Sequence, residues 1–278
     1  MVREYRWRLS VRSYEADAWG LAPTSVILRY FEQSAVAAAA ALGYGSDFHR
    51  EHNSAWVVRR LNVVMHAPAR QGDELEIATW ISHFAKVRGG REYKVLNAAT
   101  GQPLYSGYTE WVYLDRRTLA PLAIPRGLDA VFDVPGAPLQ TYDPPTVEPS
   151  PSPGPPRFLT ERTADWHELD SLGHVNNAVY VDWLDDAFKS AQDQMGWNVR
   201  PLKEVGLHLR AEHYSLNYKR AAMQGGTLRI HTALEAASGR LCAVRHTVAT
   251  TGGDDLLAAS AVYGWRDNEG RASGPLAL

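Results

Sequence analysis

Two ionisable side chains in the second half of the chain, Asp170 and His174, stand four positions apart with Gly173 between them. An ordinary carboxylate is ionised at neutral pH, so Asp170 could deprotonate a water molecule or attack a carbonyl carbon directly. His174 could orient that carboxylate, donate to the carbonyl oxygen or protonate a leaving group. Gly173 permits a close approach of the backbone to a ligand. These residue types therefore predict an active site, with the base route and the covalent route both open.

A helix must begin directly after these residues. Apolar side chains recur at helical spacing after the turn, at Val179, Trp183, Leu184 and Ala187. Asn176 and Asn177 stand where a helix cap belongs. Because the first N–H groups of a helix lack internal partners, we expect the N–H groups from Gly173 to Asn176 to hold a developing oxyanion. Capping alone remains the alternative explanation for Asp170 and Asn177.

The two halves of the chain repeat each other at a constant offset. Four residues of the first half recur 153 positions later as the same type, namely Asp17, Gly20, Gly43 and Gly72 at Asp170, Gly173, Gly196 and Gly225. Between the halves, nine of the sixteen prolines fall within residues 135–156, which cannot form a helix or a central strand. The pattern predicts a domain at 1–134, a semi-rigid extended linker at 135–156 and a second domain at 157–278.

Each half predicts one long helix and about five mostly antiparallel strands, which is an α+β arrangement. In the first half the helix occupies residues 24–45, and the strands lie at 6–15, 55–68, 73–84, 91–98 and 104–115. In the second half the helix follows Asn176, and the strands lie at 158–166, 207–220, 227–234, 241–250 and 256–267.

The composition of the chain indicates its cellular compartment and the classes of partner that it can bind. Lys plus Arg total 29 against 31 Asp plus Glu, so a net charge of −2 provides no field that recruits nucleic acid or an anionic membrane. No run reaches the ~18 apolar residues of a membrane span. Cys242 is the single cysteine and the opening segment lacks a signal-peptide pattern, so we expect a cytoplasmic protein. His49 and His52 have helical spacing but no third ligand nearby, and we predict neither a metal nor a cofactor.

Taken together, these motifs resemble the hotdog superfamily and, within it, the acyl-acyl carrier protein (acyl-ACP) thioesterases. The stretch WHELDSLGHVNNAVYVDWL at 166–184 is similar to that family's pattern Asp-x-Asn-x-His-Val-Asn-Asn. Segments 55–80 and 109–125 look like its N-terminal repeat. The resemblance implies two tandem hotdog domains, each a long central helix wrapped by a curled antiparallel sheet. It also implies an acyl-chain pocket in the first domain and chemistry in the second.

The resemblance implies catalytic roles for Asp170, His174 and Asn176. Substrate contacts are expected around the helix start, at Gly173, Val175, Asn177 and Tyr180. Two departures from the family matter: its second Asn is Leu172 here, and the Glu-Cys pair of plant members falls on Ala221-Ala222. A cysteine nucleophile at that position is therefore excluded.

The first copy has lost the polar groups of the second. Its Asp17 precedes Leu21, Ala22 and Pro23 where the second copy has His174, Val175 and Asn176, so we expect a structural role for Asp17. The depth of a chain pocket would depend on four aromatic residues of the first half, which are otherwise ordinary core residues, Tyr30, Phe31, Trp56 and Trp80.

We therefore expect a thioesterase that hydrolyses fatty acyl-ACP to a free fatty acid and ACP. Acyl-CoA is an alternative substrate carrier, because both carriers present the same pantetheine arm. A hotdog hydratase or dehydratase also fits these residues, and so does a non-catalytic acyl-thioester-binding module. Two hotdog domains in one chain can form the two-fold unit that single domains form as dimers, so a monomer and a homodimer both remain open. No nucleic-acid or membrane partner is expected.

Overall fold

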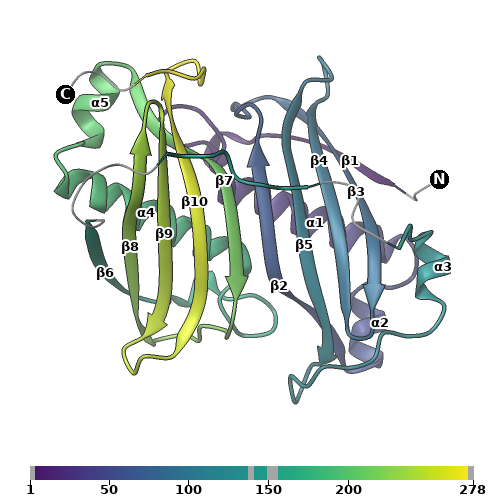
Figure 1. The fold of residues 1–278 in the computed structure, drawn as a ribbon. Coiled ribbons are helices and arrows are strands. Elements are labelled where there is room, and N and C mark those ends of the chain that lie inside the picture. The colour runs from purple at the N-terminus through teal and green to yellow at the C-terminus, as the bar shows by residue number, and fades with distance from the viewer. Residues whose placement is uncertain (1–3, 137–140, 149–155, 275–278) are drawn as a thin grey trace. The chain divides into compact units, whose positions relative to one another are not determined.

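The computed structural model of this protein describes residues 4–136, 141–148 and 156–274. It divides into two compact units, Met1–Tyr142 and Asp143–Leu278, which run from purple to teal and from green to yellow in Figure 1. The division falls inside the predicted proline-rich segment. Each unit is α+β, with one long helix and a five-stranded antiparallel sheet, which is the predicted hotdog arrangement.

The first unit orders its strands β1-β3-β4-β5-β2, each antiparallel to its neighbour. Its elements in chain order are β1 (Tyr5–Ser10), α1 (Thr24–Ala40), α2 (Ser46–Glu51), β2 (Ser54–Met65), β3 (Glu74–Ala85), β4 (Arg88–Asn97), β5 (Pro103–Asp115) and α3 (Leu128–Phe132).

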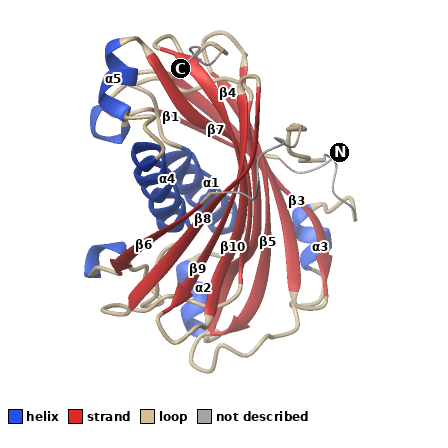
Figure 2. Ribbon diagram, turned by 60° about the vertical axis from the view of Figure 1, so that its left-hand side comes forward, coloured by secondary structure: helices blue, strands red, loops and turns tan. Residues whose placement is uncertain are grey.

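Helix α1 packs against one face of this sheet, and the core lies between them. Phe31 of α1 stacks on Tyr93 of β4, with ring centroids 4.2 Å apart and planes 5° apart. A side chain at Gly107 would place its Cβ 2.3 Å from the Phe31 ring, so only glycine fits there. The sheet and α1 therefore approach each other closely at Gly107, and Figure 2 shows α1 on the concave side of the strands.

The second unit orders its strands β7-β10-β9-β8-β6, again antiparallel throughout. Its elements are β6 (Arg157–Thr163), a 3-10 turn (Trp166–Glu168), α4 (Asn177–Gln194), α5 (Val199–Glu204), β7 (Leu207–Tyr218), β8 (Thr227–Ser238), β9 (Leu241–Thr250) and β10 (Asp255–Asp267).

Helix α4 buries the apolar face that its sequence periodicity predicts. Trp183, Leu184 and Ala187 are all buried, and so is Phe188, whose ring lies 4.1 Å from that of Tyr263 on β10. Figure 2 shows α4 on the concave side of its strands. The sheet therefore holds the N-terminal end of α4, and the loop before it, in a defined position.

Some element boundaries differ from those predicted. The helix expected at 24–45 ends at Ala40, where Gly43 takes a left-handed φ of 86° and closes the helix end. Helices α3 and α5 were not predicted, because five or six residues are too short to show a helical repeat of apolar positions. None of the helices within the described residues is long and apolar enough to cross a membrane.

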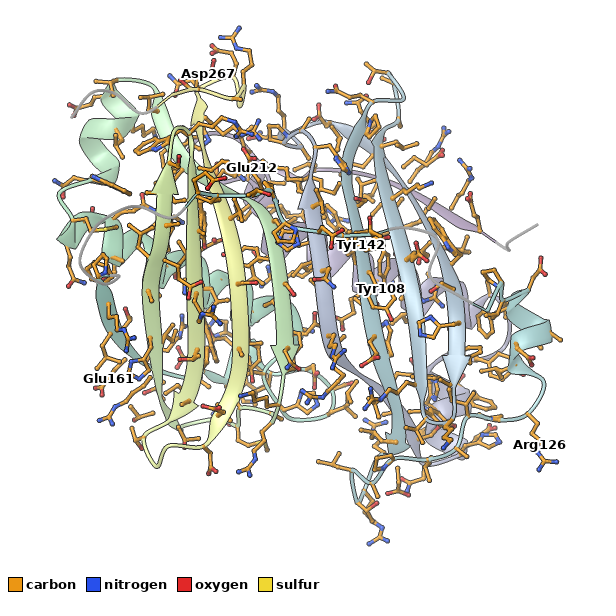
Figure 3. The ribbon with its side chains drawn as sticks, viewed as in Figure 1. Tyr108, Arg126, Tyr142, Glu161, Glu212 and Asp267 are labelled. Atoms are coloured by element: carbon orange, nitrogen blue, oxygen red, sulfur yellow. The ribbon has the colours of Figure 1, made fainter. Side chains whose placement is uncertain are left out.

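The described part of the proline-rich segment, residues 141–148, forms neither helix nor strand. Its Tyr142 hydroxyl donates a hydrogen bond to Glu92 of β4 at 3.2 Å, and its ring lies 6.2 Å from that of Tyr108 on β5. Figure 3 shows Tyr142 and Tyr108 beside each other over the sheet. Tyr142 thus anchors the segment to the first sheet. The rest of the predicted linker, at 137–140 and 149–155, lies outside the described residues.

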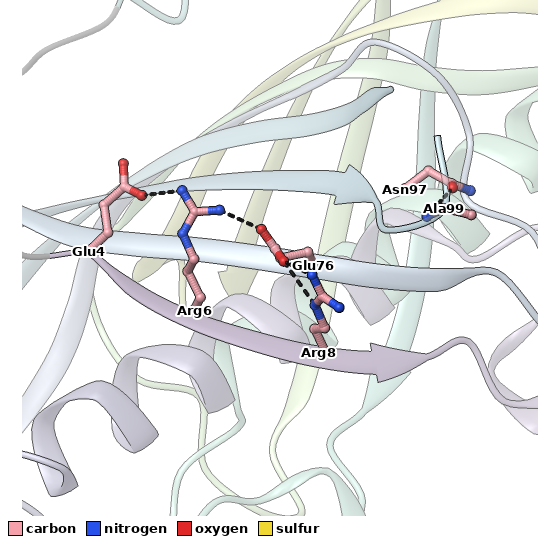
Figure 4. Close-up of polar contacts among 6 residues, drawn as sticks. All are labelled: Glu4, Arg6, Arg8, Glu76, Asn97 and Ala99. Carbon is pink, nitrogen blue, oxygen red and sulfur yellow. Dashed lines mark hydrogen bonds and ion pairs between the residues drawn. The ribbon is translucent and has the colours of Figure 1, made fainter. Parts of the chain in front are cut away.

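The edge strand β1 is joined to β3 by charged pairs as well as by its backbone. Glu76 accepts hydrogen bonds from Arg6 at 2.5 Å and from Arg8 at 2.7 Å, and Arg6 also pairs with Glu4 (Figure 4). In the same view, Asn97 Oδ1 accepts from the Ala99 N–H at 3.0 Å in the turn after β4. Charged side chains on an edge strand discourage pairing with another chain.

Candidate active site

The segment between the 3-10 turn and α4 folds back on itself as a tight loop. The Asp170 N–H donates to the His174 carbonyl at 2.8 Å, and the Gly173 N–H donates to the Asp170 carbonyl at 3.0 Å. Gly173 closes this turn with φ of 80°, a conformation that residues with a Cβ rarely adopt. Gly173 therefore shapes the loop, and this role accounts for its presence without invoking a ligand.

The loop brings Asp170 and His174 together. His174 Nδ1 lies 3.1 Å from Asp170 Oδ2, while Asp170 Oδ1 accepts from the Leu172 N–H at 2.8 Å. The side chains of His174 and Asp170 are 17% and 23% exposed, respectively, so a ligand can reach both. The hydrogen bond to Asp170 raises the pKa of His174, against the opposing effect of burial. The contact with Asp170 thus stabilises the protonated form of His174.

Asn176 caps helix α4, and Asn177 is its first helical residue. The Asn176 side chain accepts from the Ala178 N–H at 2.9 Å, as expected of an N-cap asparagine. The Asn177 carbonyl in turn accepts from the Tyr218 hydroxyl at 2.9 Å. The position of the helix start is therefore tied both to its cap and to strand β7.

The expected oxyanion donors need a correction. The Val175 N–H donates to the Ala222 carbonyl at 2.9 Å, and the Asn176 N–H donates to the Glu168 carbonyl at 3.0 Å. The Gly173 N–H donates within the loop, to Asp170. These three N–H groups are consumed because the loop pairs with itself and with the turn after β7. They are not available to a thioester oxygen in this conformation.

Two other residues that were expected to contact the substrate, Val175 and Tyr180, are buried in the structure. The Tyr180 hydroxyl accepts from the Ala222 N–H at 2.9 Å. Burial raises the pKa of Tyr180 to about 12, so its hydroxyl stays protonated. Ala222 contacts both the loop and α4, because its carbonyl accepts from the Val175 N–H and its N–H donates to the Tyr180 hydroxyl. Val175 and Tyr180 therefore help to fix the loop and the start of α4 through their hydrogen bonds to Ala222.

One residue of the site was missed by the sequence analysis. Glu168 is buried, and its carboxylate accepts three hydrogen bonds of 2.8 Å, from Trp183 Nε1, Arg162 Nη2 and the Asp165 N–H. It thereby joins α4, β6 and the start of the loop. The sequence signal was the capping-box spacing of Asp165 and Glu168 ahead of the loop.

The first copy builds the same loop without the histidine. The Asp17 N–H donates to the Leu21 carbonyl at 2.9 Å, and Asp17 Oδ1 accepts from the Trp19 N–H at 2.9 Å. Glu15 repeats the position of Glu168 and accepts from the Tyr30 hydroxyl at 2.6 Å. The geometry agrees with a structural role for Asp17, because its carboxylate serves the turn and Leu21 carries no ionisable group.

The four aromatic residues expected near a chain pocket separate in the structure. Phe31 and Tyr30 are buried on α1, and Trp56 lies 4.9 Å from the Tyr113 ring. Trp80 faces the other way: Lys94 lies 5.3 Å over its ring, and strand alternation puts both on the face opposite Tyr93. Trp80 therefore cannot line a pocket beside α1.

The other candidate groups have local partners. His49 Nδ1 lies 3.0 Å from Ser54 Oγ, and His52 Nδ1 lies 2.9 Å from the Phe48 carbonyl. Within the described residues no three His, Cys, Asp or Glu side chains are arranged to hold a metal ion. Burial raises the pKa of Cys242 to about 11, which makes it a poor nucleophile.

Comparison with known families matches both halves of the chain. Residues 3–131 match the model of the acyl-ACP thioesterase N-terminal domain, and residues 164–275 match the model of the thioesterase-like superfamily. The second match contains the Asp170 and His174 loop.

Curated relatives include three chloroplastic plant proteins. The palmitoyl-ACP thioesterase of Arabidopsis thaliana is 29% identical over 202 residues, covering 65% of this chain and 46% of the relative. That of Cuphea hookeriana is 26% identical over 195 residues, with the same coverage. The dodecanoyl-ACP hydrolase of Umbellularia californica is 24% identical over 275 residues, covering 92% of this chain and 66% of the relative. The chain spans about half the length of the first two relatives.

Solved structures share the fold over nearly the whole chain. A putative oleoyl thioesterase from Lactobacillus plantarum superposes with a TM-score of 0.77 at 19% identity, covering 95% of both chains. The 12:0-ACP thioesterase from Umbellularia californica gives 0.72 at 20% identity, covering 95% of this chain and 94% of the other. Together these findings show that the chain consists of two tandem hotdog domains, of which the first matches the acyl-ACP thioesterase N-terminal domain and the second matches the thioesterase-like superfamily.

Proposed function

We propose that this protein hydrolyses fatty acyl-ACP to a free fatty acid and ACP. The observation that carries the proposal is the contact of 3.1 Å between His174 and Asp170 at the start of α4, in the half that matches thioesterases. The relatives named as palmitoyl-ACP and dodecanoyl-ACP hydrolases support the substrate class. The matched first half, whose loop lacks the histidine, supports a single catalytic half.

In this proposal Asp170 either deprotonates a water molecule that attacks the thioester carbon or attacks that carbon itself. The C–S bond then breaks, and the thiolate leaves with its electron pair. On the covalent route a water molecule then hydrolyses the mixed anhydride on Asp170, which releases the fatty acid and restores the carboxylate. On either route the proton taken from water goes to the thiolate or to solvent. A thiol pKa of about 8.5 means that the thiolate departs with little acid assistance. His174 uses Nδ1 for Asp170, so its Nε2 is the group offered to the carbonyl oxygen in place of the consumed backbone N–H groups.

Release of free thiol from acyl-ACP and acyl-CoA of several matched chain lengths tests the function. We expect Asp170→Asn to lower kcat on acyl-ACP by roughly 10²- to 10⁴-fold, the usual contribution of a positioned base. Asp17→Asn is the matched control, because Asp17 occupies the same turn in the first copy, and we expect nearly wild-type turnover. Equal losses in the two variants would contradict the assignment of one catalytic half.

The same assay distinguishes this function from the competing ones. A higher kcat/KM on acyl-CoA would make this an acyl-CoA thioesterase. A hydratase or dehydratase would alter the acyl chain without thiol release, and a binding module would retain the thioester intact. We propose a cytoplasmic location as well, because the single cysteine, Cys242, is buried and no disulfide is required. The three plant relatives are chloroplastic, so microscopy of a tagged full chain is the test.

A further inference from the structure

Two large apolar side chains are exposed to solvent on the segments that flank the Asp170 and His174 loop. Trp166, in the 3-10 turn before the loop, is 75% exposed, and Met223, in the turn after β7, is 59% exposed. Isolated exposed apolar residues are ordinary, but a pair beside a proposed active site is typical of ligand contact, because burying that surface is favourable. Both residues belong to the second unit, which also carries the ionisable pair.

The turn after β7, residues 219–226, is hydrogen-bonded to the chain on both sides of the loop before α4. Ahead of the 3-10 turn, the Ala164 carbonyl accepts from the Gly225 N–H at 3.0 Å. At the far end of the loop, the Val175 N–H donates to the Ala222 carbonyl at 2.9 Å. The two exposed apolar residues therefore lie on segments that meet at the loop.

The first copy builds the same connections but carries different side chains at these two positions. Two of its backbone hydrogen bonds are equivalent to those above at the same offset of 153, from the Gly72 N–H to the Val11 carbonyl and from the Ala22 N–H to the Ala69 carbonyl. At this offset Trp166 corresponds to Ser13, and Met223 corresponds to Arg70. The copy with the ionisable pair thus has an indole and a thioether where the copy without it has a hydroxyl and a guanidinium.

The basic side chains in the turn after β7 are paired with acidic ones. Lys219 Nζ lies 2.7 Å from Asp255 Oδ2, and Arg220 Nη1 lies 2.6 Å from Asp254 Oδ1. The charges of this turn are therefore balanced. An uncharged ligand segment complements such a surface better than a charged carrier does.

The pantetheine arm is the uncharged segment that acyl-ACP and acyl-CoA share. In a thioester whose carbonyl carbon lies at Asp170, the arm continues from the sulfur in the direction opposite to the acyl chain. Asp170 and His174 are themselves partly exposed, so the arm leaves the site over the surface around the loop. Its methylene and geminal methyl groups can pack against an indole and a thioether.

We propose that Trp166 and Met223 bind the pantetheine arm of the substrate and thereby hold the thioester at Asp170. The two residues contact a part of the substrate that does not react, so their loss should raise KM and leave kcat nearly unchanged. The inference rests on the proposed thioesterase function and identifies a substrate-contact site for it.

The test compares dodecanoyl thioesters of four thiols, namely N-acetylcysteamine, pantetheine, CoA and ACP. We expect Trp166→Ser, which introduces the residue of the first copy, to raise KM by a similar factor, roughly 10, for the three substrates that carry the whole arm. The N-acetylcysteamine thioester keeps only the end of the arm, so its KM should change little. Met223→Gln keeps the side-chain length but adds polarity, and it should raise the same three KM values by a smaller factor.

Tyr14→Ser is the matched control. Tyr14 is 79% exposed and lies in the equivalent 3-10 turn of the first copy, Ser13–Glu15, whose following loop carries no histidine. We expect all four KM values to stay as in the wild type. The three substituted residues are exposed, so the variants should remain folded, and urea unfolding checks this.

A rise in KM confined to acyl-ACP would mean that the two residues contact the carrier protein, and it would overturn the proposal. An equal rise for the N-acetylcysteamine thioester, or no rise for any substrate, would overturn it as well. Calorimetric binding of dodecanoyl-pantetheine to Asp170→Asn, with and without Trp166→Ser, gives a readout independent of turnover. If the wild type hydrolyses none of the thioesters, the proposed function fails, while binding that Trp166→Ser weakens would still support the arm site.

Discussion

At the scale of single residues, the site depends on what the Asp170 carboxylate contacts. One oxygen accepts from the Leu172 N–H and the other faces His174. The equivalent oxygen of Asp17 accepts from the Trp19 N–H in the first copy. The turn-forming role of the aspartate is thus common to both halves, and the histidine is the feature that distinguishes the second. Asp170 therefore stabilises the turn and does not cap α4, a role that Asn176 takes, while its catalytic role stays a prediction.

The pair predicts a pH dependence of stability. Because the pKa of His174 is raised in the folded protein, the protonated form is stabilised by folding. This contribution is fully present below the unfolded pKa near 6.5 and is lost as the pH rises through the higher folded pKa. At low pH we expect the free energy of unfolding of the wild type to be roughly 1 kcal/mol larger than that of the His174→Gln variant. Urea unfolding of both proteins across pH measures this difference; a gap that widens with rising pH would contradict it.

At the scale of elements, the loop before α4 is positioned by one buried carboxylate. Glu168 joins the helix through Trp183 and the edge strand through Arg162, whose guanidinium also lies 4.6 Å over the Trp183 ring. Its own carbonyl accepts from the Asn176 N–H, so both ends of the loop meet at this residue. The positions of Asp170 and His174 therefore depend on the contacts that Glu168 makes with Trp183 and Arg162.

Glu168→Gln tests this positioning role. The change leaves Arg162 and the Asp165 N–H poorly paired, so we expect a loss of about 1–3 kcal/mol in stability. A small displacement of the loop should also lower kcat by on the order of 10²-fold, measured as thiol release from acyl-ACP. Glu15→Gln is the matched control, because Glu15 accepts from Tyr30 and the Arg12 N–H in the first copy.

The control should lose stability to a similar extent and keep most of its turnover. If both variants lose the same fraction of activity at a temperature where both remain folded, Glu168 acts only through global stability. A kcat effect confined to Glu168→Gln, with an altered pH profile, is the signature of a displaced pair.

At the scale of the whole molecule, the duplication is visible in the hydrogen bonds. The Ala22 N–H donates to the Ala69 carbonyl at 2.9 Å in the first unit, and the Val175 N–H donates to the Ala222 carbonyl at 2.9 Å in the second. Each pair joins the loop before the long helix to the turn after a long strand. The two units therefore share a mechanism for holding the helix start, although only the second carries the ionisable pair.

Cys242 offers a probe of the intact chain. It is buried on β9, and its pKa is raised to about 11, so its thiol should react slowly with a disulfide reagent in the native protein. We expect at least a roughly 100-fold faster reaction in denaturant, because opening the second unit exposes the thiol. Labelling rates of the Asp170, His174 and Glu168 variants then report whether each is folded. Rapid labelling of the native wild type would show that β9 opens readily.

The sequence alone determined the local features of this protein. The offset between Asp17 and Asp170 predicted the duplication, and the apolar periodicity after Asn176 predicted α4, because these patterns depend on neighbours along the chain. The short spacing of Asp170 and His174 likewise predicted their proximity, which the structure places at 3.1 Å.

Only the tertiary structure decided how the polar groups are paired. The Val175 N–H is consumed by Ala222, 47 positions away, and this contact removes an oxyanion donor that the helix start alone predicts. Hydrogen-bond partners and burial are set by strand register and packing between distant segments, and composition and periodicity carry no record of them.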